Sequence, residues 1–355
     1  MQQIDVSKNE AGQKLLKLLG KYLDAAPQSF LHKMLRKKNI TLNGKKADGT
    51  ELLKETDRVC LFLSEETIAS FQKGAANRKT PSGTAKTSET GLPTLAQLYR
   101  KDKGLAQITV VYEDEDVLIV NKPAGVLSQK AAPTDVSVNE WVIAYLTEKK
   151  EFTEQQAKTF RPGICNRLDR NTSGLLLAGK SLAGLQTLSA LLKERTVHKD
   201  YFCIVCGKVE REQRLKGYLV KNEKTNKVTV SEGNKVAEGD YIETEYTPVA
   251  TSGSFTLLRV RLITGKTHQI RAHLASEGHG LVGDMKYGNA EKNRDMQRRF
   301  GLKHQLLHAA YLEFPEQMEN CSALSGKRFQ APVPESFLRI AKELSVAVPE
   351  LTNER

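Results

Sequence analysis

Between residues 201 and 262 the chain has one short apolar-rich segment after another, which we interpret as strands with a side-chain period of two. The segments are Tyr201–Val205, Gly217–Lys221, Val228–Val230, Tyr241–Tyr246 and Phe255–Leu262. A period of two is typical of strands that bury one face. Strands that follow one another without helices between them favour antiparallel pairing over a doubly wound parallel sheet. This part of the chain is therefore predicted to form an antiparallel sheet.

The region before these segments adds further strands and two helices. Residues 110–112 and 117–120 bracket an acidic turn, and 174–179 (GLLLAG) is predicted to be a buried strand. A helix is expected around 138–149, and Ser181 is placed to cap another that carries leucines on one face. The fold class is therefore α+β, with a mixed, largely antiparallel sheet and flanking helices.

The first 65 residues have their own pattern. Apolar residues at helical spacing predict two short helices on either side of Pro27, followed by a strand that enters an Asn43-Gly44 hairpin turn. The basic residues Lys33, Arg36, Lys37, Lys38 and Lys45 gather around the second helix and the hairpin. They indicate either an RNA-binding surface or an ordinary solvated helix face, and the residues alone favour neither.

These patterns divide the chain into a domain at 1–65, a flexible linker at 66–107, a larger domain at 108–345 and a tail at 346–355. The linker prediction depends on 73–91, which contain no Val, Ile, Leu, Phe, Tyr or Trp. Such a segment cannot bury enough apolar surface to offset the entropy of ordering it.

Composition limits the partners and the compartment. The 355 residues are 39% hydrophobic, which supports a core, and the net charge of +12 makes a polyanion a plausible partner. No apolar run is long enough to span a bilayer, so we expect a cytoplasmic protein without a membrane partner. Five scattered cysteines argue against a disulfide framework.

A metal site is not expected. Cys203 and Cys206 are three apart in a predicted strand, which points their thiols to opposite faces. His268, His273 and His279 do not share one helical face, so we interpret them as structural rather than as zinc ligands.

Two polar clusters carry the candidate chemistry. In the first, Asp169 lies between Arg167 and Arg170, and guanidinium groups, which do not lose their charge, favour an ionised carboxylate. A structural ion pair in a turn is the alternative. In the second cluster Thr267 is placed to cap a helix on which Arg271 and Leu274 share a face. An arginine near a helix N-terminus opposes the helix dipole, so we expect it to meet a carboxylate, with Asp169 as the candidate.

The N-terminal pattern resembles the small RNA-binding domain named after ribosomal protein S4, through its two helices, its basic stretch, I-T-L-N-G-K and T-D-R-V. The motifs R-L-D-R-N-T-S-G-L-L-L and T-G-K-T-H-Q-I-R-A-H-L resemble those of the RluA-type RNA pseudouridine synthases. V-N-K-P-A-G-V, G-D-M-K-Y-G and L-L-H-A-A-Y-L-E-F follow the order of that family. The whole chain is most similar to its RluC-like branch, which modifies large-subunit ribosomal RNA.

The resemblance implies a pseudouridine synthase fold and a role for each matching residue. Asp169 is expected to attack the ribose or assist cleavage of the C1′–N1 bond, Tyr201 to stack on the base and accept a proton, and Arg271 to pair with the aspartate. The expected substrate-binding residues are Arg167, which fills the place of the extruded uridine, the pocket residue Leu274, and Lys122 and Arg170. The reaction is an isomerisation, and the sequence has no nucleotide-binding glycine motif, so no cofactor is expected.

We therefore expect an RNA pseudouridine synthase, an isomerase that acts as a monomer, most plausibly on 23S rRNA. A catalytically silent RNA-binding or ribosome-assembly protein and a tRNA-directed synthase are the alternatives. A glycoside hydrolase needs a second catalytic carboxylate, for which Asp284 is the candidate, but its glycine-flanked motif is more typical of a turn. Asn166 and Ser128-Gln129 stand where many family members have His and His-Pro, which leaves the target uridine open.

Overall fold

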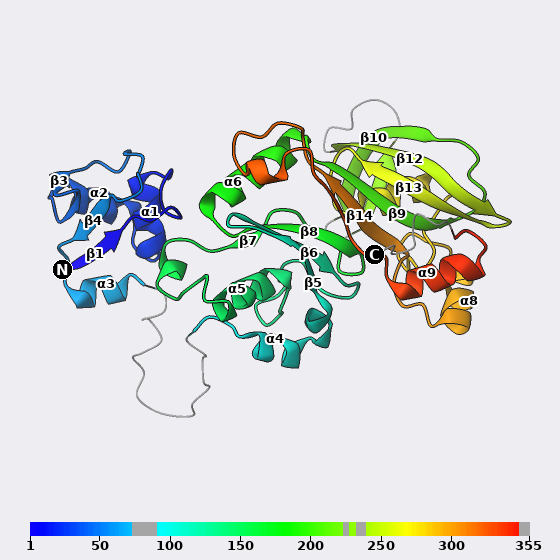
Figure 1. Cartoon of the computed structure of the whole chain (residues 1–355), viewed down its shortest axis with the longest axis horizontal. Coiled ribbons are helices and arrows are strands. Elements are labelled where there is room, and N and C mark those ends of the chain that lie inside the picture. The colour runs from blue at the N-terminus through cyan, green and yellow to red at the C-terminus, as the bar shows by residue number, and fades with distance from the viewer. Residues whose placement is uncertain (73–90, 223–226, 232–238, 348–355) are drawn as a thin grey trace.

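The structure is a computed structural model that describes residues 1–72, 91–222, 227–231 and 239–347. Figure 1 shows a small N-terminal domain at one end of the molecule and a large sheet that forms the rest. Residues 73–90 of the predicted linker and residues 348–355 of the predicted tail lie outside the described residues.

The N-terminal domain is a four-stranded sheet with helices packed on it. The sheet order is β1-β4-β2-β3, and the elements are β1 (Gln2–Asp5), α1 (Leu15–Tyr22), α2 (Gln28–Arg36), β2 (Ile40–Leu42), β3 (Lys45–Lys46), β4 (Arg58–Leu61) and α3 (Glu65–Ser70). The apolar faces of α1 and α2 meet the sheet in one core, which explains their helical spacing. Asn43 and Gly44 both have positive φ, of 52° and 73°, as a tight hairpin turn requires. The two predicted helices and the hairpin are confirmed.

Part of the segment predicted as a linker, 66–107, is folded into helices. Its start forms most of α3, which Ser64 caps and Ile68 anchors in the N-terminal core. Its end forms α4 (Leu95–Lys101) and the 3-10 helix η2 (Lys103–Gln107), whose Leu98 and Leu105 are buried in the core of the large domain. One or two buried apolar residues anchor each segment, and the composition of 73–91 carried no information about them.

The large domain is built on an eleven-stranded mixed sheet of the order β11-β10-β12-β13-β9-β14-β8-β6-β5, with β15 beside β14 and β7 beside β8. All these pairs are antiparallel except β14 with β8. The strands are β5 (Thr109–Glu113), β6 (Val117–Lys122), β7 (Gly163–Ile164), β8 (Ser173–Gly179), β9 (His198–Cys206), β10 (Gln213–Asn222), β11 (Lys227–Ser231), β12 (Asp240–Ser252), β13 (Phe255–Leu262), β14 (Leu307–Glu313) and β15 (Arg328–Gln330). The mixed, largely antiparallel sheet is confirmed.

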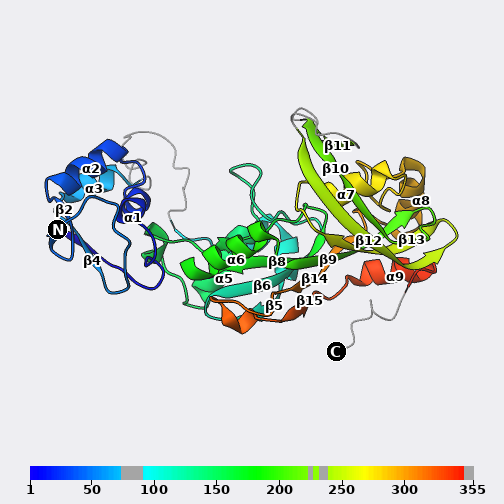
Figure 2. The same ribbon diagram turned by 90° about the horizontal axis from the view of Figure 1, so that it is seen from above.

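Helices cover this sheet and connect its strands (Figures 1 and 2). They are α5 (Val138–Glu148), α6 (Leu182–Glu194), α7 (Gln269–Ser276), α8 (Ala290–Phe300) and α9 (Glu335–Glu343), with the short η3 (Gln156–Lys158) and η4 (Ser322–Leu324). Alternate residues of β8 enter two different cores, Leu176 one that includes Trp141 of α5, and Leu177 one that includes Leu188 of α6. The strand is buried on both faces, and therefore its sequence is continuously apolar.

The cysteines and two of the histidines have structural positions. Cys203 and Cys206 lie in different cores on the two faces of β9, and both are free thiols. His273 Nδ1 is 3.0 Å from Thr244 Oγ1, and His279 Nδ1 is 3.1 Å from the Cys206 carbonyl oxygen. Over the described residues no group of three His, Cys, Asp or Glu side chains is placed to hold a metal, and no helix is long and apolar enough to cross a membrane.

The two domains touch through the first residues of the chain. Thr159 donates a 2.6 Å hydrogen bond to Glu10, whose carboxylate is almost completely buried. Lys8 lies 3.5 Å from Glu115 and 3.6 Å from Asp116 on the large domain. These contacts hold the N-terminal domain beside the β5–β6 turn.

Candidate active site

Asp169 lies in the loop that leads into β8, and this loop is clamped from two sides. Ser128 Oγ donates to the Leu168 carbonyl oxygen at 2.8 Å and accepts from the Leu168 N–H at 3.1 Å. The Thr172 N–H donates to the Asp169 carbonyl oxygen at 3.0 Å. Gly174, the second residue of β8, has φ 116°, and a Cβ there would lie 2.2 Å from the Ala309 carbonyl oxygen. Only glycine fits there, so the loop ends against β14 at one defined place.

The Asp169 side chain is one quarter exposed and meets Arg271, which α7 carries on its buried face. Arg271 Nη1 donates to Asp169 Oδ2 at 2.8 Å. The predicted pairing of these residues, 102 positions apart, is present. In the described part of the chain the Asp169 carboxylate forms an ion pair with Arg271, and His268 Nε2 lies 3.9 Å from it, whereas its sequence neighbours Arg167 and Arg170 form no ion pair with it.

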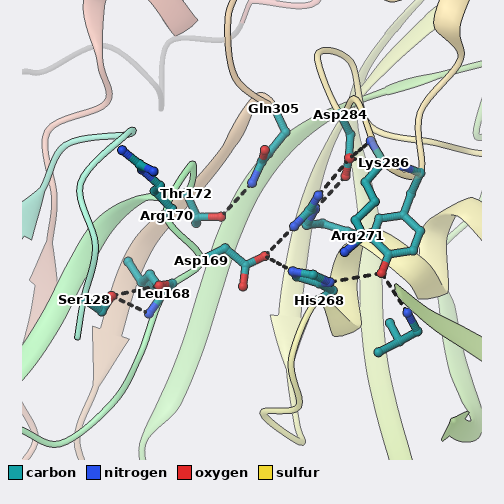
Figure 3. Close-up of polar contacts among 12 residues, drawn as sticks. Ser128, Leu168, Asp169, Arg170, Thr172, His268, Arg271, Asp284, Lys286 and Gln305 are labelled. Carbon is teal, nitrogen blue, oxygen red and sulfur yellow. Dashed lines mark hydrogen bonds and ion pairs between the residues drawn. The ribbon is translucent and has the colours of Figure 1, made fainter. Parts of the chain in front are cut away.

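Asp284 holds Arg271 from the other side (Figure 3). Its carboxylate is fully buried and accepts two bonds from the guanidinium, at 2.6 Å from Nε and 2.9 Å from Nη2. The backbone N–H groups of Lys286 and Tyr287 donate to the same carboxylate at 2.9 and 3.1 Å. Such a bidentate pair fixes the plane of the guanidinium, so Arg271 presents its remaining nitrogen to Asp169.

The charge states of this chain of groups follow from burial and pairing. Burial alone would raise the pKa of Asp284, but the hydrogen bonds and charge of Arg271 outweigh it and hold that pKa below its usual range. Burial would lower the pKa of Arg271, and its two carboxylate partners raise it instead. Asp284 and Arg271 are therefore both ionised at neutral pH. Asp284 has no proton to give and no exposed oxygen, so it cannot act as the second carboxylate of a glycoside hydrolase.

The start of α7 differs from the prediction. The N-cap is His268 rather than Thr267, with left-handed φ 56° and ψ 16°, and no side chain caps the helix. Thr267 is exposed. Gln269 stabilises the turn instead, because its side chain accepts from Thr264 Oγ1 and donates to the Glu243 carbonyl oxygen.

A small pocket of about 80 Å³ opens beside Asp169. Its walls include Tyr201, Arg167 and Ile270 as well as Asp169 and Arg271. Among the described residues the Tyr201 hydroxyl has no hydrogen-bond partner, although the residue is almost completely buried. Burial and the nearby Asp169 charge raise the pKa of Tyr201, so the phenol keeps its proton at neutral pH.

The other predicted substrate-binding residues lie elsewhere. Leu274 is fully buried in the core, and Ile270, one turn earlier on α7, lines the pocket in its place. Lys122 is fully buried and donates to three backbone carbonyl oxygens, of Pro123, Val126 and Arg170. Arg170 lines a separate depression and donates to the Gly125 carbonyl oxygen at 2.9 Å. Lys122 and Arg170 thus join two loops in this structure, and Leu274 does not contact the pocket.

Burial lowers the pKa of Lys122 to about 7, while the nearby Asp169 charge raises it. Its three donated hydrogen bonds use all three ammonium hydrogens. The geometry therefore describes the protonated lysine, which adds a second positive charge behind the Asp169 loop.

The sequence interpretation missed three functional neighbours of Asp169. It treated Asp284 as a turn residue, His268 as structural and Ser128 as a departure from the family pattern. The 13-residue spacing between Arg271 and Asp284 does not indicate that they pair, because a loop brings Asp284 back to Arg271. Ser128 lies 40 residues before Leu168 in the sequence, so its hydrogen bonds to the Asp169 loop can be recognised only in the folded structure.

The predicted RNA-binding residues lie on α2, directly after α2 and on β3 of the N-terminal domain. Lys33, Arg36, Lys37, Lys38 and Lys45 are all exposed. Lys33 and Arg36 line a depression of about 380 Å³ together with Lys46. We call Lys33, Arg36 and Lys46 the basic groove.

Comparison with known proteins adds to this geometry. A family model described as RNA pseudouridylate synthase matches residues 116–276, a range that contains Asp169, Tyr201 and Arg271. Ribosomal large subunit pseudouridine synthase C of Escherichia coli strain K12 is 28% identical over 347 residues, which are 96% of each chain. The protein of the same name from Vibrio cholerae serotype O1 is 29% identical over 315 residues, 88% of this chain and 89% of the relative.

The fold is also similar to that of a solved structure. Human RNA Pseudouridylate Synthase Domain Containing 4 superposes with a TM-score of 0.55 and 18% sequence identity, over 70% of this chain and 96% of the human one. At this identity the likeness concerns the fold, and it supports the pseudouridine synthase fold expected for the large domain.

Proposed function

We propose that this chain, a member of the RNA pseudouridylate synthase family, isomerises uridine to pseudouridine in large-subunit ribosomal RNA, with Asp169 as the nucleophile. The observation that carries the proposal is the position of the Asp169 carboxylate. It is partly exposed at a pocket that also contains the Tyr201 ring, and Arg271 and Asp284 anchor it from behind.

The two oxygens of Asp169 have different surroundings. Oδ2 accepts from Arg271, whereas Oδ1 has no hydrogen-bond partner in the described part of the chain. A carboxylate held by one oxygen keeps the other available for attack. We therefore assign Oδ2 as the anchored oxygen and Oδ1 as the reacting oxygen.

The proposed reaction balances without an external reagent. Oδ1 bonds to ribose C1′ while the C1′–N1 bond breaks and leaves its electron pair on uracil N1. The base turns, C5 bonds to C1′, and the carboxylate leaves with the electron pair of its C1′–O bond. C5 then loses a proton and N1 gains one. The net change is an isomerisation, which requires neither an oxidant nor a group donor.

Tyr201 and Arg167 are proposed to hold the substrate. A uridine within RNA structure must leave its stack to reach Asp169, and stacking and cationic contacts offset that cost. The Tyr201 ring lines the pocket and suits stacking on the extruded base, and the exposed Arg167 guanidinium lies at the same pocket. Ile270 replaces Leu274 in the proposal as the apolar wall.

The basic groove supports RNA as the substrate. Its three cations stand on the N-terminal domain, which the Glu10 and Lys8 contacts hold against the large domain. We propose that the groove binds phosphates of the same RNA whose uridine enters the pocket. We also propose that the enzyme is monomeric and cytoplasmic.

The test is pseudouridine mapping on large-subunit rRNA transcript and on bulk tRNA, each incubated with purified protein or with Asp169→Asn. We expect pseudouridine in the rRNA with the wild type, and none with Asp169→Asn, which keeps the side-chain volume but not the nucleophile. Equal RNA affinity of the two proteins, measured by filter binding, serves as the folding control.

Two results would overturn the proposal in different ways. Pseudouridine in tRNA alone would mean that tRNA, and not large-subunit rRNA, is the substrate. No product in either RNA, with RNA binding intact, would make the chain a binding protein without this activity.

A further inference from the structure

His268 occupies a place at the site that the proposed reaction does not yet use. Its imidazole faces Asp169 (Figure 3) and contacts the Tyr287 hydroxyl on the other side. The side chain is only 12% exposed. Nε2 is 3.9 Å from Asp169 Oδ2, and Nδ1 is 3.0 Å from the Tyr287 hydroxyl oxygen. The ring therefore points one nitrogen at the carboxylate and the other away from it.

The partners of Tyr287 decide which nitrogen carries the proton. The Tyr287 hydroxyl oxygen accepts a hydrogen bond from the Val228 N–H at 3.0 Å. We assign its own hydrogen to the contact with His268, so that Nδ1 accepts it. A neutral histidine with an accepting Nδ1 has its hydrogen on Nε2, so an N–H group faces the carboxylate.

The surroundings keep this histidine neutral. Burial lowers the pKa of His268, Asp169 raises it, and Arg271 and Lys286 lower it again, with a smaller opposing effect of Asp284. Tyr287, which packs edge-on against the ring, completes the groups that face it. The net direction is downward, so the imidazole is a neutral donor at neutral pH.

The backbone of His268 lies in the left-handed region, which residues other than glycine adopt uncommonly, although histidine is among those enriched there. With φ 56° it adopts the left-handed region, and as the N-cap of α7 it caps no N–H with its side chain. Residues other than glycine in this region are strained and cluster at functional sites. The conformation serves neither the helix end nor a tight turn that glycine would fill, but it does aim the ring at Asp169.

We propose that His268 is a positioning residue that donates from Nε2 to the anchored oxygen of Asp169. In the free protein the 3.9 Å separation is too long for a hydrogen bond, and such contacts tighten when substrate fills a site. With Arg271 and His268 both holding Oδ2, the carboxylate cannot rotate, and Oδ1 stays directed at C1′. This inference rests on the proposed synthase activity.

Two substitutions separate this role from a structural one. The amide nitrogen of glutamine reaches about as far as Nε2 of histidine, and the amide of asparagine reaches about as far as Nδ1. His268→Gln therefore keeps a donor for Asp169, whereas His268→Asn keeps only the contact with Tyr287. Asparagine tolerates positive φ better than glutamine does. A structural role predicts that Asn is the better replacement, and the positioning role predicts Gln.

The experiment measures kcat and the KM for RNA of the wild type and the two variants with the rRNA substrate. We expect His268→Gln to retain kcat within about threefold, and His268→Asn to lose at least tenfold, a change of about 1.4 kcal/mol in the barrier, with KM unchanged. Equal rates for the two variants, a faster asparagine variant, or a loss confined to KM would each overturn the inference.

Tyr287→Phe provides a second, independent variant. It removes the hydrogen that fixes His268 Nδ1 as an acceptor, so we expect kcat to fall about fivefold in the wild-type background and not at all in His268→Gln. Tyr112→Phe is the matched control, since the Tyr112 hydroxyl binds Asp114 away from the site. A fall of the same size in both backgrounds would contradict the coupling.

The activity of the wild type distinguishes a failure of the proposed function from a failure of the proposed role of His268. If the wild type forms no pseudouridine, the proposed function fails, whatever the variants do. If it is active and the two His268 variants behave alike, only the role of His268 is lost.

Discussion

Replacing Asp284 with asparagine tests whether a residue that touches no substrate sets the geometry of the site. The carboxylate is fully buried and accepts four hydrogen bonds, two from Arg271 and two from backbone N–H groups. Asparagine has the same shape but a single acceptor oxygen. Its amide hydrogens face guanidinium hydrogens on the other side, so the bidentate contact with Arg271 is lost.

The expected loss of stability follows from the partners that remain. Breaking a buried ion pair on one side costs about 3–5 kcal/mol, because it leaves a buried charge without compensation. Arg271 keeps its 2.8 Å contact with Asp169, and asparagine keeps one acceptor, so we expect the low end, about 3 kcal/mol. We also expect kcat to fall at least tenfold, because Arg271 no longer has a fixed orientation from which to hold Asp169.

Urea unfolding followed by the fluorescence of Trp141 measures the first quantity. Trp141 is the single tryptophan and lies in the core that also contains Tyr201 and Ile270. Asp295→Asn is the matched control, because Asp295 is 39% exposed and pairs with Arg298 and Arg299 on the surface of α8 at 3.3 and 3.4 Å. Such pairs contribute under about 1 kcal/mol. An Asp284→Asn protein as stable and as active as the Asp295→Asn control would refute the reasoning.

The pH dependence gives a further check with a defined sign. The pKa of Asp284 is lower in the folded protein than its ordinary 3.8, so its contribution is fully present above that value and is lost as pH falls through the folded pKa. The stability difference between wild type and Asp284→Asn should be constant around neutral pH and shrink below about pH 4. A difference that grows in acid would contradict the assigned charge state.

Two further predictions concern binding and the base. Replacing Lys33, Arg36 and Lys46 of the basic groove with glutamine should weaken RNA binding and leave kcat at saturating RNA unchanged. The slope of log affinity against log salt concentration should become less steep by about 0.7–0.9 for each lost phosphate contact. An unaltered slope would mean that the RNA binds elsewhere on the protein. Tyr201→Phe keeps the ring and removes a hydroxyl that has no hydrogen-bond partner among the described residues, so we expect stability within about 1 kcal/mol of the wild type but at least a tenfold loss of kcat. Full activity of Tyr201→Phe would limit the residue to stacking.

Much of the fold could be predicted because its signals are local. A period of two between 201 and 262, the double-sided apolar run of β8, the Ser181 cap and the Asn43-Gly44 turn each depend on a few adjacent residues, and all four are present in the structure. The segments 65–70 and 95–107 were missed because a short helix anchored by one or two apolar residues has no distinct period. Thr267 was misjudged because a cap prediction assumes that the residue nearest the helix has ordinary backbone angles, and His268 does not.

At the site, the sequence by itself determined which groups are available: a carboxylate between two arginines, a tyrosine in a strand and an arginine at a helix start. It also supported the pairing of Asp169 with Arg271, since an arginine there needs a counter-charge. Tertiary structure alone decided that Arg271 is shared with Asp284, that Ile270 rather than Leu274 reaches the pocket, and that Lys122 faces backbone carbonyls. The physical reason is distance along the chain. Local periodicity assigns a side chain to a face, but which face meets which partner depends on how loops from β8, β13 and α7 converge after the sheet has formed.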